Sequence, residues 1–128
     1  IGLIEGIWII GVIDEVRMCA QSGIERPLLV DTKTRSQAVL PSEPQKRNAR
    51  LQLMCYKFLW DNIVTDDFPS SSFFQYFGLQ PQRPLSKDIR KHIGDSGIGK
   101  NVRSLDDLIK FYMRTCKSLP SADKQLLL

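Results

Sequence analysis

Short apolar runs occupy the first third of the chain, and longer segments follow in which apolar residues recur every three or four positions. The run Ile7–Val16 is dense in β-branched and aromatic residues, which predicts a strand that Gly11 would bend. Leu28 begins an unbroken apolar run of the kind found in buried strands, so we expect a second strand over Leu28–Thr34. Turn-forming residues between Cys19 and Pro27 indicate that the two strands pair as an antiparallel hairpin.

Helical periodicity continues from Gln45 to Val64 and is the clearest such pattern in the chain. Its apolar positions, spaced by three and four, predict a face buried in the core, with a tyrosine and polar residues beside it. The members of the apolar stripe are Leu51, Met54, Cys55, Phe58, Leu59 and Ile63.

The remaining chain predicts smaller elements. We expect a short helix over Ser86–His92, ended by Gly94, and another that a Ser104 capping box starts and Pro120 stops. Asp66–Pro84 is turn-rich, and its aromatic cluster is expected in the core or in a lid over it, with base stacking as the alternative. The apolar end at 124–128 predicts the start of a further strand.

Composition is that of a single globular domain, with 42% hydrophobic and 25% charged residues among 128. Lys and Arg exceed Asp and Glu by 18 to 14, a mild excess that favours a polyanionic partner. No apolar run approaches the roughly 20 residues that cross a bilayer, so we expect no membrane association. Three widely separated cysteines indicate free thiols of an intracellular protein, and both chain ends suggest a fragment.

A carboxylate and an amine close the second apolar run. Because strand side chains alternate between faces, Asp31 and Lys33 point the same way, about 7 Å apart. Such a pair can bind a divalent metal through the acid while the ammonium orients or activates a water nucleophile. The hairpin would bring Asp14, which lies between Val12 and Val16 on an apolar face, within reach of both. The alternative is an edge strand with a weak, solvated ion pair.

The long helix carries two further polar features. Gln52 and Tyr56 lie one turn apart and therefore on the same face. Lys46, Arg47 and Arg50 place positive charge in the first turns, where it opposes the helix dipole and where a bound polyanion would relieve that opposition. A solvated basic face is the alternative for this cluster.

Taken in order, these pieces resemble one nuclease family. The motifs Val12-Ile13-Asp14-Glu15, Val30-Asp31-Thr32-Lys33-Thr34-Arg35 and Gln52-Leu53-Met54-Cys55-Tyr56 resemble the PD-(D/E)XK nucleases of the RecB type, whose closing motif is Q-x-x-x-Y. With their flanks they are similar to the eukaryotic exonuclease V (defects-in-morphology) family, over roughly Gly11–Val64. The resemblance implies an α/β, restriction-endonuclease-like core, a mixed sheet flanked by helices. In this chain the core would be incomplete at both ends, with its motifs in 11–64, a helical and loop region in 65–120 and a further strand beginning at 124–128.

The resemblance also implies roles for individual residues. Asp14 and Asp31 would bind Mg²⁺, with Mn²⁺ as an alternative, and Lys33 would position or deprotonate the attacking water. Many relatives have glutamate where this chain has Asp31, and the shorter side chain should still reach a cation that keeps several waters. Gln52 and Tyr56 would bracket the site. The residues expected to contact the nucleic-acid backbone are Arg35, Lys46, Arg47 and Arg50.

At the level of function, the resemblance implies a single-stranded-DNA 5′ exonuclease in DNA repair, acting in the nucleus or mitochondrion, or in the plastid of a plant. A single-strand-binding protein is a further expected partner, and we expect a monomer. Family members carry a [4Fe-4S] cluster, but no cysteine here has iron–sulfur ligand spacing, so its ligands are expected outside this chain, which leaves the activity of the isolated chain open. Two alternatives stay open: an inactive nucleic-acid-binding module with the same fold, and a structural or partner-binding domain.

Overall fold

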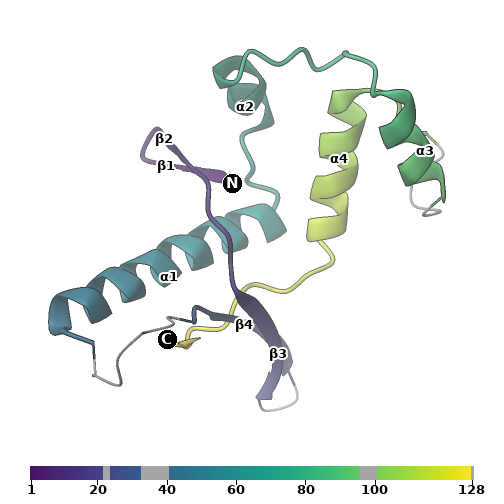
Figure 1. The fold of residues 1–128 in the computed structure, drawn as a ribbon. Coiled ribbons are helices and arrows are strands. Elements are labelled where there is room, and N and C mark those ends of the chain that lie inside the picture. Colours follow the sequence, from purple (N-terminus) through teal and green to yellow (C-terminus); the bar gives the residue numbers. More distant parts are fainter. Residues whose placement is uncertain (22–23, 33–40, 96–100, 128) are drawn as a thin grey trace.

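The computed structural model describes residues 1–21, 24–32, 41–95 and 101–127. Over these residues the chain has a mixed α/β architecture, with four helices and two small sheets (Figure 1). The long helix α1 packs against β1, β4, β5 and α4. In chain order the elements are β1 (Gly2–Ile4), β2 (Ile7–Ile9), β3 (Glu15–Gln21), β4 (Ile24–Val30), α1 (Glu43–Val64), α2 (Ser70–Tyr76), α3 (Lys87–Asp95), α4 (Leu105–Cys116) and β5 (Leu126–Leu127).

The first sheet is a small hairpin of β1 and β2, and it corrects the prediction of one strand over Ile7–Val16. β2 ends at Ile9, and β3 begins only at Glu15. Glu5 and Gly6 form the turn with φ of 48° and 78°, the left-handed pair that suits the twist of a two-residue hairpin. The prediction was wrong because β-branched residues continue from β2 through the segment 10–14 to Val16, so composition alone does not mark the break.

The second sheet has the order β3-β4-β5 and is mixed. β3 and β4 are antiparallel, with Glu15 opposite Val30, which confirms the predicted hairpin. β4 starts and ends earlier than the expected Leu28–Thr34, and residues 33–34 lie outside the described residues. β5 pairs parallel with β4, Leu29 opposite Leu126, so the strand expected at the chain's end is confirmed.

The core joins α1, β4 and the segment that precedes β5. Leu29, Leu53 and Ala122 form its fully buried centre, with three partly buried neighbours in Ile13, Tyr56 and Trp60. The predicted helix is confirmed, but part of its predicted buried face is wrong, since the exposed fractions of Leu51, Met54 and Phe58 are 57%, 58% and 49%. Apolar side chains of α1 point in most directions around the helix axis, so the position of β4 determines which of them are buried.

An aromatic cluster attaches the β1–β2 hairpin to α2, a helix in the region that the sequence predicts to be turn-rich. The Trp8 ring lies 5.6 to 6.1 Å, between centroids, from the rings of Phe68, Phe73, Tyr76 and Phe77. Phe74 next to them is buried, while Tyr76 is exposed. Aromatic rings prefer such tilted and edge-to-face contacts. The cluster is therefore a packed unit beside the main core.

The two helices that follow agree with the sequence patterns. α3 begins after Ser86, whose hydroxyl accepts the Ile89 N–H, and it extends past the expected stop at Gly94 to Asp95. α4 begins with the predicted capping box, in which Ser104 and Asp107 each accept the other's backbone N–H. Among the described helices, none combines the length and the apolarity that crossing a bilayer requires.

Candidate metal and nucleic-acid site

Asp14 and Asp31 meet at one end of the β3–β4 hairpin. Asp31 directly follows β4 and is only 3% exposed, whereas Asp14 directly precedes β3. Because Glu15 faces Val30 in the register, the two aspartates come next to each other along the pair of strands. The Asp14 carboxylate accepts the Thr32 N–H at 2.8 Å. The fold thus brings Asp14 to the end of β4, as the hairpin predicts.

The surroundings of Asp14 differ from the prediction. The segment 10–14 leaves β2 and runs across α1 before β3 begins, so Asp14 does not lie on a buried strand (Figure 1). Asp14 is exposed, and so are Val12 and Val16, which were expected to form an apolar face with it. This exposure leaves the Asp14 carboxylate accessible to a hydrated cation.

Gln52 and Tyr56 lie together on α1, as their spacing predicts. The Gln52 amide donates to the Tyr56 oxygen at 2.9 Å, and both side chains are partly buried. The Tyr56 ring packs on the core cluster and against Gly11, three residues before Asp14 in the chain. α1 therefore presents this pair to the segment that carries Asp14.

The predicted basic residues differ in their availability. The Lys46 ammonium lies 2.7 Å from the Glu43 carboxylate, and this contact lowers the pKa of Glu43. Arg47 and Arg50 are exposed on the first turns of α1. Lys33 and Arg35 lie outside the described residues, and their roles stay predictions.

The donors at the hairpin end suit a hard cation. Mg²⁺ binds through one or two carboxylates and keeps several waters, whereas zinc is held by three or four nitrogen and sulfur ligands. Over the part of the chain that the structure describes, no three His, Cys, Asp or Glu side chains gather. The two aspartates supply oxygen donors, which fit Mg²⁺ or Mn²⁺ and fit zinc poorly.

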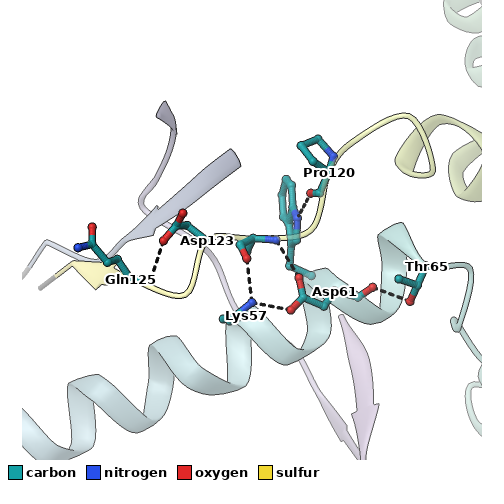
Figure 2. Close-up of polar contacts among 8 residues, drawn as sticks. Lys57, Asp61, Thr65, Pro120, Asp123 and Gln125 are labelled. Atoms are coloured by element: carbon teal, nitrogen blue, oxygen red, sulfur yellow. Dashed lines mark hydrogen bonds and ion pairs between the residues drawn. The ribbon is translucent and has the colours of Figure 1, made fainter. Parts of the chain in front are cut away.

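A second polar cluster, which the sequence patterns did not reveal, holds the chain before β5 onto α1; we call it the α1 clamp (Figure 2). Lys57 Nζ lies 2.7 Å from Asp61 Oδ2 and donates to the Ala122 carbonyl at 2.9 Å. Asp61 Oδ1 accepts the Ala122 N–H at 2.8 Å. The available signal was the i,i+4 spacing of Lys57 and Asp61, which marks an ion pair but not its third partner.

Neighbouring bonds extend the α1 clamp to β4. The Trp60 indole donates to the Pro120 carbonyl at 3.0 Å (Figure 2). The Asp123 N–H donates at 2.8 Å to the carbonyl of Pro27, a buried residue of β4. These bonds place Ala122 in the core and align β5 with β4, the strand that Asp31 directly follows.

Comparison with known proteins identifies the family to which this chain belongs. Residues 20–110 match the family model of exonuclease V, described as a 5′ deoxyribonuclease. That range contains Asp31, Lys33, Gln52 and Tyr56 and begins after Asp14. The chain is also 32% identical over 124 residues to exonuclease V of Danio rerio, an alignment covering 95% of this chain and 30% of that protein. The chain spans about a third of the length of this relative. The resemblance seen in the motifs is thereby confirmed: the chain belongs to the exonuclease V family.

Proposed function

We propose that this chain is part of a metal-dependent deoxyribonuclease that degrades single-stranded DNA as a 5′ exonuclease. The observation that carries the proposal is the convergence of Asp14 and Asp31 at the end of β4, where Thr32 N–H binds Asp14 at 2.8 Å. Family membership supports the substrate class, because the family is described as a 5′ deoxyribonuclease. The β3–β4–β5 sheet and α1 would then be the central part of a restriction-endonuclease-like core.

In this proposal Asp14 and Asp31 hold Mg²⁺, or Mn²⁺ in its place. When bound, the ion would supply Lewis-acid chemistry toward a phosphoryl oxygen and would ease deprotonation of a water nucleophile. Lys33, two residues after Asp31, would orient the attacking water. The Tyr56 oxygen already accepts a hydrogen bond from Gln52, so its own proton is available to a phosphate oxygen.

DNA binding rests on the first turns of α1. Arg47 and Arg50 are exposed there, and guanidinium groups bind phosphate in a bidentate manner. Lys46 shares its charge with Glu43 at 2.7 Å and contributes less than the two arginines. Arg35 is a further proposed backbone contact.

An iron–sulfur cluster does not fit the residues of this chain. Cys19, Cys55 and Cys116 lie on β3, α1 and α4, and no group of three ligand-type side chains forms among the described residues. The ligands of the cluster that the family resemblance implies would come from the rest of a longer protein. No step of the proposed reaction uses it.

The biological setting follows from the family and belongs to the same proposal. A single-strand exonuclease suits genome maintenance in the nucleus or an organelle that holds DNA. A single-strand-binding protein, which covers the same substrate, is the proposed partner.

The decisive experiment measures cleavage of 5′-labelled single-stranded DNA by the full-length protein and by its Asp31→Asn variant, each with Mg²⁺. The substitution removes a metal ligand and one negative charge facing phosphate, so cleavage should be lost while DNA affinity stays the same or rises. Asp67→Asn is the matched control, because Asp67 is exposed beyond the end of α1.

Cleavage by Asp31→Asn at more than about a tenth of the wild-type rate, a barrier change under roughly 1.4 kcal/mol, would contradict the metal assignment. A wild-type protein that binds DNA but never cleaves it would instead identify an inactive binding module.

A further inference from the structure

The segment 10–14, between β2 and β3, passes unusually close to α1. A Cβ atom at Gly11 would lie 2.6 Å from the Tyr56 hydroxyl oxygen and 2.8 Å from Cζ of the same ring. Carbon atoms that are not bonded pack at about 3.5 to 4.0 Å, so the space beside the ring admits glycine alone. Gly11 is required here for close approach and not for a left-handed backbone, since the positive φ values of described glycines occur at Gly6 and Gly78.

Tyr56, which is partly buried, has two further contacts besides Gly11. Its oxygen accepts the Gln52 amide at 2.9 Å, and its ring packs on the buried cluster that contains Leu29 and Leu53. A closely packed side chain has little room to withdraw. A larger residue at position 11 would therefore move the segment 10–14 away from α1.

The same segment ends at Asp14. Ile13 packs on the core cluster, and the Asp14 carboxylate accepts the Thr32 N–H at 2.8 Å. The segment thus has contacts at Gly11, Ile13 and Asp14, and the first of them determines how near its chain lies to α1. A displacement at Gly11 is carried over three residues to the carboxylate.

We propose that Gly11 and the ring of Tyr56 are positioning residues that hold Asp14 opposite Asp31. The ring of Tyr56 then supports the Asp14 segment, while its hydroxyl, which also lies beside Gly11, is the group that the proposed function assigns to the substrate. The importance of this contact for catalysis rests on the proposed nuclease function; the contact itself does not.

Two measurements on the full-length protein test the proposal with Gly11→Ala. The first is amide hydrogen exchange of the peptide containing Thr32, without metal, because it reports the bond to Asp14. The second is Mg²⁺ and Mn²⁺ affinity by calorimetry. We expect faster exchange and an affinity loss of about tenfold or more, as when a residue that orients a metal ligand is replaced.

Gly2→Ala is the matched control. A Cβ at Gly2 would crowd the Leu59 side chain, 3.4 Å from its Cγ atom and closer to a terminal methyl, on the same helix but away from the Asp14 segment. It should lower the melting temperature without changing Thr32 exchange or metal affinity. Gly94→Ala in α3, where a Cβ meets nothing within 4 Å, should change neither Thr32 exchange nor metal affinity.

A double-mutant cycle keeps the test decisive even if Gly11→Ala folds poorly. Tyr56→Phe keeps the ring and should retain the protection of Thr32, whereas Tyr56→Ala should lose it. Adding Gly11→Ala to Tyr56→Ala should then have no further effect, because the crowding atom is gone.

The proposal is overturned if Gly11→Ala leaves Thr32 exchange and metal affinity unchanged, if Gly2→Ala changes them equally, or if Tyr56→Phe and Tyr56→Ala exchange alike. If Thr32 exchange responds as expected but the wild-type protein binds no divalent metal through Asp31, the positioning contact stands and the proposed nuclease function fails.

Discussion

Aspartates lie in two regions around β4, and their surroundings differ. In the α1 clamp, Asp61 has both carboxylate oxygens engaged, one by the Lys57 ammonium and one by the Ala122 N–H. At the hairpin end, Asp14 accepts one backbone N–H and, within the described residues, makes no ion pair. Asp31 lies beside it, almost fully buried.

The difference in partners distinguishes a structural carboxylate, that of Asp61, from a candidate metal ligand, that of Asp14. A carboxylate that leaves water needs a cation or donors, and in the α1 clamp the protein itself supplies both. Two neighbouring aspartates concentrate negative charge that a divalent cation from solution neutralises. Both regions contain aspartates, with Asp61 partly buried, Asp31 almost fully buried and Asp14 exposed, and the described partners of Asp61 and Asp14 indicate their roles.

The largest expected effect concerns Lys33, the cation that follows the hairpin-end aspartates in sequence. If Lys33 acts on the water nucleophile, Lys33→Ala should lower turnover of the full-length protein by two or more orders of magnitude, about the scale of a lost acid–base group. Metal affinity measured by calorimetry should change little. Equal losses of turnover and metal affinity would make Lys33 a counter-ion, and the two regions would then be alike.

The next effect tests the α1 clamp. Asp61→Asn should lower the free energy of unfolding by about 1 to 3 kcal/mol, the scale for hydrogen bonds to charged groups. Specific activity of the folded protein should remain, because the side-chain partners of Asp61 among the described residues are Lys57 and Ala122, neither of which belongs to the proposed site. Denaturant titration and single-strand cleavage, with Asp67→Asn as control, measure the two properties. A loss of activity without a loss of stability would reverse the assignment of the two aspartate regions.

A smaller effect is expected for Tyr56→Phe, which removes only the hydroxyl at the edge of the site. As a group facing the substrate, the hydroxyl should contribute about 1 kcal/mol to the barrier, equivalent to a severalfold loss of turnover. The melting temperature should stay nearly constant, because the ring still packs on the core. Unchanged turnover with reduced stability would place the hydroxyl in the core and not in the site.

The smallest effect comes from Asp107, whose carboxylate accepts the N–H groups of Ser104 and Arg103 at 3.0 and 3.1 Å. The Ser104 backbone N–H and then that of Arg103 lower the pKa of Asp107 below its ordinary value. A lowered folded-state pKa contributes stability that is complete above the ordinary pKa and is lost as pH falls through the lowered one. Unfolding titrations of wild type and Asp107→Asn should converge at acid pH; a constant difference would exclude this contribution.

Local rules account for much of what the sequence predicts correctly. The Ser104 capping box, the i,i+4 pair of Gln52 and Tyr56, and the extent of α1 all depend on residues within about one helical turn. The β3–β4 hairpin also follows from a short turn between two apolar runs, and with it the approach of Asp14 to the end of β4. The order of these elements along the chain therefore predicts that Asp14 lies near Asp31 and that Gln52 lies beside Tyr56.

The predictions failed where residues distant in sequence determine which side chains are buried and where a strand ends. Leu51 and Phe58 are as apolar as Leu53, yet only Leu53 is fully buried, because β4 and Ala122 lie on its side of α1. The run Ile7–Val16 divides where Gly11 meets Tyr56, and no rule of strand propensity contains that contact.

By itself, the sequence determined the family motifs, the long helix and the pairing that brings Asp14 to Asp31, because these depend on neighbouring residues and on one short connection. Only the tertiary structure decided which side of α1 is buried, how the segment before Asp14 is held and which distant backbone group Asp61 binds in addition to Lys57. The Asp61–Ala122 bond joins residues 61 positions apart. Such a contact exists only after the intervening chain has folded, so local periodicity cannot predict it.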